Sequence, residues 1–129
     1  EQFRDWVAPY DIQVLAAAPS LVRIAHLHGE DADPELIADY PVEVLSWSDK
    51  ASAPTIPEAA SHYGWVPMVG IDELTSLYWT PSEAVAHVIQ ARRAAGDRLI
   101  VAPNCTLHSD INPLTLVGLR RGVDVALTY

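Results

Sequence analysis

The sequence contains one cysteine, few basic residues and no long apolar run. The single cysteine, Cys105, cannot form an internal disulfide, which excludes a disulfide-stapled secreted scaffold. Lys and Arg total 8 against 17 Asp and Glu, so the formal net charge is -9. Nucleic acids and anionic membranes bind basic surfaces, and this charge balance therefore excludes both as the main partner.

The sequence also lacks targeting signals. No apolar run approaches the ~18 residues that a transmembrane helix requires, and no basic segment precedes an apolar stretch as in a signal peptide. We therefore expect a cytoplasmic protein. The first residue is Glu rather than Met, from which we expect a trimmed chain or a fragment.

The composition is that of a folded domain. Half of the 129 residues are hydrophobic and 19% are charged, which favours a packed core and excludes wholesale disorder. The length fits one domain, or part of one, over residues 1–129.

Strand-like and helix-like patterns alternate along the chain. Apolar segments typical of strands lie at residues 21–28, 42–47, 65–71 and 99–104. Helical patterns lie at residues 10–19, 35–40, 57–63, 80–95 and 112–122. The helix at 80–95 has the clearest start, because Thr80 can cap it, Pro81 suits its first position and Glu83 completes a capping box.

This alternation predicts an α/β fold with about four parallel strands. No Gly-rich phosphate loop follows a strand, so a dinucleotide-binding fold is not predicted. A (β/α)8 barrel needs eight strands, so four strands make either a small open sheet or a partial barrel. The edge strands of a partial barrel would invite pairing with another chain.

Polar side chains cluster where the predicted strands end. His26 and His28 close the first strand, Asp72 and Glu73 follow the third, and Cys105 follows the fourth. Ligands bind at the carboxyl ends of parallel strands in α/β folds, so this is where a site is expected.

Three of these residues form a candidate zinc site. His26 and His28 share one face of their strand, since side chains alternate along a strand. With Cys105 they supply the three protein ligands of a catalytic zinc, which keeps its fourth position open. The spacing from His28 to Cys105 is far outside that of a zinc finger, so only the fold could join them. The alternative is two hydrogen-bonded histidines and an inert cysteine.

The remaining candidates are weaker. Asp72 and Glu73 could orient a ligand or act in acid–base catalysis, although adjacent loop carboxylates are more often solvated. Residues 108–110 (His-Ser-Asp) have the composition of a hydrolase triad, but consecutive residues seldom adopt its geometry. His62 and His87 lie in predicted helices and are expected at the surface.

Five segments carry a resemblance to a known family. They are residues 3–10 (FRDWVAPY), 26–30 (HLHGE), 40–47 (YPVEVLSW), 69–73 (VGIDE) and 99–113 (LIVAPNCTLHSDINP). In their order and spacing they resemble the C-terminal half of the uroporphyrinogen decarboxylase superfamily. That resemblance implies a single domain holding the last four strands of a (β/α)8 barrel.

The family has two chemistries. Decarboxylases remove acetate carboxylates from uroporphyrinogen III without a cofactor. Their relatives move a methyl group from a corrinoid protein to a thiol such as coenzyme M, with zinc held by a His-x-Cys pair and a distant Cys. The resemblance makes His26 the zinc histidine and Cys105 the distant cysteine, which favours methyl transfer. The decarboxylases carry His at the position of Cys105.

His28 departs from the methyltransferase pattern, which has Cys there. Imidazole is also a good zinc ligand, but exchanging a thiolate for it makes the site one charge more positive. We therefore expect Zn²⁺ bound by His26, His28 and Cys105, with Cys105 and Asp72 as the catalytic candidates. The thiol would be a small molecule, the corrinoid would be presented by a partner, and no bound organic cofactor is expected.

Two alternatives stay open, and so does the question of whether this chain is itself an enzyme. One is a uroporphyrinogen III decarboxylase that binds a tetrapyrrole. The other is a non-catalytic half-barrel that pairs with a second copy, as a homo-oligomer, or with the other half of a barrel.

Overall fold

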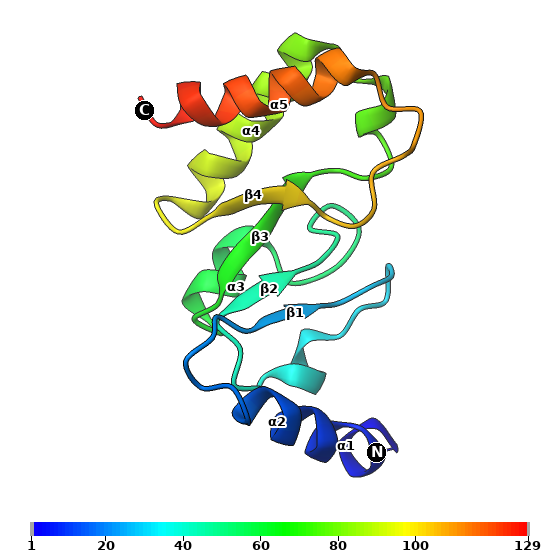
Figure 1. Ribbon diagram of the computed structural model, residues 1–129, viewed down its shortest axis with the longest axis vertical. Coiled ribbons are helices and arrows are strands. Elements are labelled where there is room, and N and C mark those ends of the chain that lie inside the picture. The colour runs from blue at the N-terminus through cyan, green and yellow to red at the C-terminus, as the bar shows by residue number, and fades with distance from the viewer. Residues whose placement is uncertain (1, 129) are drawn as a thin grey trace.

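The computed structural model describes residues 2–128 and contains one sheet of four parallel strands (Figure 1). The strands follow the chain order across the sheet: β1 (Ile24–His26), β2 (Val44–Ser46), β3 (Val66–Ile71) and β4 (Ile100–Pro103). Residues 1 and 129 of the expected domain lie outside the described part.

Helical segments alternate with these strands. The α-helices are α1 (Gln2–Trp6), α2 (Ala8–Ala16), α3 (Ile56–Ser61), α4 (Pro81–Ala95) and α5 (Pro113–Ala126), and the 3-10 helices are η1 (Pro34–Ile37) and η2 (Ser76–Tyr78). The predicted α/β fold with four parallel strands is confirmed, and it is consistent with a partial barrel.

Several predicted boundaries were wrong. The first strand, expected over residues 21–28, is paired only from Ile24 to His26, because β1 lies at the sheet edge and its one neighbour, β2, is equally short. The segment expected to be helical at 35–40 forms a 3-10 helix over Pro34–Ile37. The last helix extends to Ala126 rather than ending near Gly122.

Side-chain caps fix the starts of the helices that follow strands. The capping box predicted for α4 is present, with Thr80 accepting from the Glu83 backbone and Glu83 reaching back to Thr80. Thr55 and Glu58 form a second capping box, at the start of α3. These caps satisfy amide groups that the first helical turn leaves without partners.

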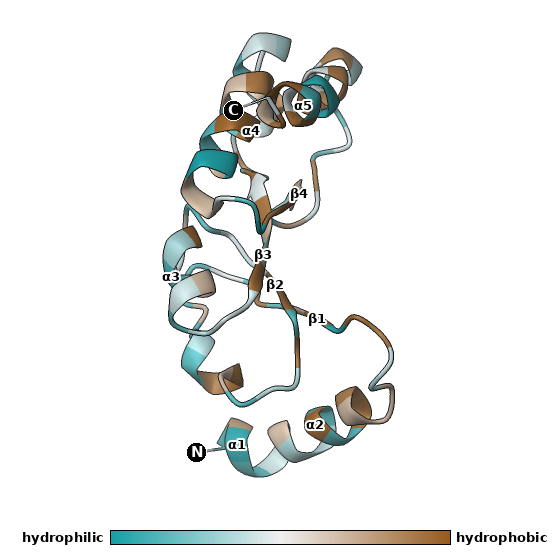
Figure 2. Cartoon of the chain, turned by 90° about the vertical axis from the view of Figure 1, so that its left-hand side faces the viewer, coloured by the Kyte–Doolittle hydropathy of each residue, from teal (hydrophilic) through white to brown (hydrophobic). Residues whose placement is uncertain are grey.

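One face of the sheet packs against the helices. Leu45, Trp47 and Val69 point to this outer face and have no solvent exposure. The Trp47 indole Nε1 also donates to the Pro54 carbonyl at 2.8 Å. Figure 2 shows the sheet nearly edge-on with α3 on this side.

The crossing of α4 and α5 extends the core at the far end of the sheet. A Cβ on Gly118 would lie 2.5 Å from the Pro81 carbonyl oxygen, and one on Gly122 would lie 2.8 Å from Val88 Cβ. The two glycines therefore allow α5 to approach α4 more closely than any other residue would.

The opposite, inner face is exposed at the two edges of the sheet but buried at its centre, where Val44 and Ser46 of β2 point to it and are 2% and 4% exposed. Ile24 of β1 and Ile100 of β4 point to it and are 49% and 41% exposed. The strands that bear them are the two edges of the sheet, so each also has one side without a neighbouring strand.

None of the helices within residues 2–128 is both long and apolar enough to cross a membrane.

Candidate metal centre

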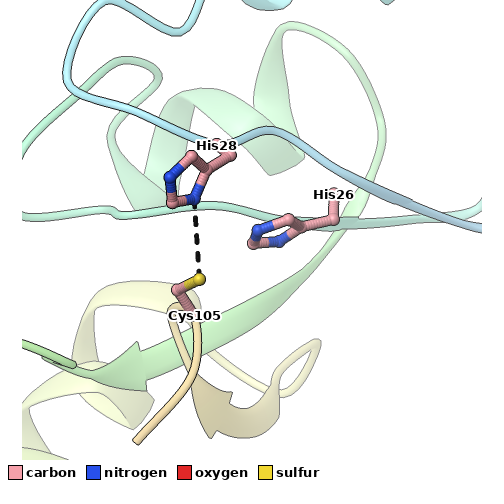
Figure 3. Close-up of side chains that lie close together, drawn as sticks. All are labelled: His26, His28 and Cys105. Carbon is pink, nitrogen blue, oxygen red and sulfur yellow. Dashed lines mark hydrogen bonds between the residues drawn. The ribbon is translucent and has the colours of Figure 1, made fainter.

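His26, His28 and Cys105 lie together at the carboxyl end of the sheet. His26 ends β1, His28 follows two residues later, and Cys105 follows the end of β4 by two residues. Their ligand atoms all lie within 4.8 Å of one another. Figure 3 shows the His26 ring pointing toward the space between His28 and Cys105.

This meeting depends on the curl of the sheet. The ligands follow β1 and β4, which are its opposite edges, and in a flat sheet three strand spacings would separate those edges by roughly 14 Å. Cys105 Sγ nevertheless lies 3.6 Å from His28 Nδ1. The curl of the sheet and the loops that follow β1 and β4 therefore bring together residues that are far apart in the sequence.

One distance within the cluster matches that of two ligands on a tetrahedral ion. Zinc binds imidazole nitrogen at ~2.1 Å and thiolate sulfur at ~2.3 Å, which places two such ligands on one tetrahedral ion ~3.6 Å apart. The separation of Cys105 Sγ and His28 Nδ1 is 3.6 Å. The His26 and His28 rings are tilted by 40° with centroids 6.1 Å apart, so they converge without stacking. The donor set and the separation of Cys105 and His28 thus fit Zn²⁺, and the other ligand atoms lie within 4.8 Å.

Ser46 touches the cluster from the neighbouring strand. Its Oγ lies 3.1 Å from His26 Nδ1, and the two residues are paired directly in the register of β1 with β2. Ser46 is buried, whereas both histidines are exposed. Sequence reasoning missed Ser46, because only the strand register shows which residue of β2 faces His26.

Asn104 holds the end of β4 beside the cluster. Its side chain is fully buried, and its Oδ1 accepts from the Gly70 amide at 3.1 Å, which ties the end of β4 to β3. The backbone N–H of Asn104 donates to the Ile71 carbonyl at 2.9 Å. These two bonds fix the backbone immediately before Cys105.

The predicted carboxylates are engaged elsewhere. Asp72 accepts from the Leu74 amide at 2.9 Å and from the Thr75 hydroxyl at 2.6 Å, so both of its oxygens are bound within its own loop. Glu73 accepts a hydrogen bond from Ser48. Within residues 2–128 neither carboxylate belongs to the group that could hold a metal, and a catalytic role for Asp72 stays a prediction.

The other histidines have separate environments. His87 stacks on Trp79 with centroids 3.8 Å apart and is half-buried, so it is less exposed than the expected surface position implies. His62 is exposed, as expected. His108 lies 3.8 Å from Asp110, but no hydrogen bond among the described residues joins His108 to Ser109. A hydrolase triad is therefore not assembled there.

The groups with clearly shifted pKa values lie outside the metal-binding cluster. Hydrogen bonds from the Arg23 side chain and backbone lower the pKa of Glu43 to about 2, and this pair joins the start of β1 to β2. Burial and a 2.8 Å hydrogen bond to Asp11 raise the pKa of Tyr40 to about 12. A hydrogen bond to Glu35 raises the pKa of Tyr63 to about 12.

No protein-family model matches this chain, and no curated protein matches it.

Proposed function

We propose that this chain is the metal-binding half of a uroporphyrinogen decarboxylase-like barrel that binds Zn²⁺ and methylates a thiol. The observation that carries the proposal is the group formed by His26, His28 and Cys105, whose ligand atoms all lie within 4.8 Å of one another. Three ligands on one ion leave a fourth position for a substrate, as in catalytic zinc sites.

The three side chains have complementary tasks. Cys105 supplies a thiolate, and His26 and His28 supply neutral nitrogens, so the protein ligands carry one negative charge in total. Bound zinc acts as a Lewis acid that lowers the pKa of a thiol, so that thiolate forms near neutral pH. Compared with a two-cysteine site, the additional positive charge favours thiolate formation but reduces the nucleophilicity of the sulfur.

The proposed reaction balances with a methyl-corrinoid as donor. The thiol gives its proton to solvent, and a lone pair of its sulfur forms the new bond to the methyl carbon. The bond between that carbon and cobalt breaks with both electrons staying on cobalt, which passes from Co(III) to Co(I).

The free sheet edges favour association as a second role. Among residues 2–128 neither β1 nor β4 has a neighbouring strand on its outer side, and the inner face carries half-exposed Ile24 and Ile100. Helical segments precede β1 and follow β4, so residues 2–128 contain helical segments in five places, one more than the number of strands. This arrangement favours a complement of four strands joined by three helices over a second copy.

Zinc loading and methyl transfer test the proposal together. Protein purified without metal is titrated with Zn²⁺, and the wild type is compared with Cys105→Ala and with His62→Ala, an exposed histidine outside the cluster. We expect about one zinc per chain in the wild type and in His62→Ala, and loss of that site in Cys105→Ala.

Each zinc-loaded protein is then given methylcobalamin and a small thiol, and the loss of the methyl–cobalt absorbance is followed. We expect zinc-dependent demethylation that Cys105→Ala abolishes. Absence of zinc binding would overturn the whole proposal. Zinc binding without demethylation would overturn the reaction and leave the metal site.

A further inference from the structure

Ser46 is a buried hydroxyl in an otherwise apolar strand. Its neighbours Leu45 and Trp47 point to the packed outer face, whereas Ser46 points to the inner face and is 4% exposed. A buried hydroxyl needs a hydrogen-bond partner, and the partner here is His26 Nδ1 at 3.1 Å. The buried hydroxyl of β2 therefore contacts His26, which is one of the proposed zinc ligands.

The two histidines present different nitrogens to the cluster. His28 directs Nδ1 toward Cys105 Sγ, at 3.6 Å, whereas the Nδ1 of His26 is occupied by Ser46. The nitrogen of His26 that is free for a metal is thus Nε2. Figure 3 shows the end of the His26 ring that lies away from its backbone directed at the space between the other two residues.

We infer that Ser46 is a positioning residue that holds His26 in the Nδ1–H tautomer and so presents Nε2 to the metal. Histidines that bind metals usually donate their other ring N–H to a fixed acceptor, which sets the tautomer and the orientation of the ring. Ser46 Oγ is such an acceptor, since it is buried and lies on a strand paired residue by residue with β1. This inference rests on the proposed zinc site.

Ser48 provides a matched control. It is also buried, two residues further along the same segment, but its hydroxyl donates to Glu73 rather than to a member of the cluster. Removing the Ser48 hydroxyl therefore deletes one buried hydrogen bond at the same end of the sheet without touching His26.

The first measurement is zinc affinity, by competition with a chromophoric chelator, in the wild type, Ser46→Ala and Ser48→Ala. Losing a partner of this kind typically weakens metal binding 10–100-fold, roughly. We expect a loss in that range for Ser46→Ala and a change below about threefold for Ser48→Ala. Equal affinities for wild type and Ser46→Ala, or equal losses in both variants, would overturn the inference.

The second measurement reads the tautomer of His26 directly, by long-range ¹H–¹⁵N NMR of the metal-free chain, assigned with His26→Gln. We expect Nδ1–H in the wild type and a shift of the population to Nε2–H in Ser46→Ala. Nε2–H in the wild type would overturn the inference. A chain that binds no zinc but keeps the Ser46-dependent tautomer would overturn the proposed function alone.

Discussion

The two faces of the four-stranded sheet differ in what covers them and in the residues they carry. The outer face bears fully buried Leu45, Trp47 and Val69 against the helices. The inner face bears half-exposed Ile24 and Ile100, and its carboxyl end carries the candidate ligands. We therefore expect the outer face to contribute most of the stability, and we propose ligand binding and association for the inner face.

We expect the largest loss of stability from Trp47→Ala, a substitution on the outer face. The indole has no solvent exposure and donates to the Pro54 carbonyl, so its removal leaves a cavity and an unpaired carbonyl. We expect a loss of about 3–5 kcal/mol in the free energy of unfolding. Urea denaturation monitored by circular dichroism measures it, and a loss below about 1 kcal/mol would contradict the assignment of the core.

The matching change on the inner face is Ile24→Ala. Ile24 is 49% exposed, so truncation removes little buried area, and we expect a loss below about 1 kcal/mol in the same assay. Leu45→Ala on the neighbouring strand serves as the control, with an expected loss of about 2–5 kcal/mol. Similar losses in the two variants would mean that the inner face is already covered in this chain.

The smallest expected effect is pH-dependent and concerns the Arg23–Glu43 pair, which joins β1 to β2. The pKa of Glu43 is lowered from 4.5 to about 2, so its stabilising contribution is present above pH 4.5 and is lost as the pH falls through about 2. We expect Glu43→Gln to lower the urea midpoint at pH 7 and to have a smaller effect at pH 3. If Glu43→Gln lowered the urea midpoint equally at pH 7 and pH 3, the charge of Glu43 would not be the source of the stabilisation.

Local signals predicted the helices better than the edge strands. The capping box at Thr80 and Glu83 and the Asn112 cap of α5 could be recognised because capping involves residues a few positions apart. The length of β1 could not be recognised from the sequence, because the paired length of an edge strand is limited by the length of the strand beside it. Residues 2–6 form α1 without a periodic pattern that would have indicated it.

The candidate site was predictable in part for the same reason. That His26 and His28 share a face follows from strand alternation alone. Their approach to Cys105 depends on the curl of the sheet, which brings its two edges toward each other. The number of residues between His28 and Cys105 does not indicate how strongly the sheet curls. Ser46 required the register of β1 with β2, which the pattern of neither strand encodes.

X-ray absorption at the zinc K-edge of the zinc-loaded chain identifies the atoms that bind the metal. We expect one sulfur at ~2.3 Å and two imidazole nitrogens at ~2.0–2.1 Å, with the remaining position filled by a light atom. Cys105→Ala should remove the sulfur contribution. A first shell of nitrogen and oxygen alone in the wild type would contradict a metal centre built from His26, His28 and Cys105.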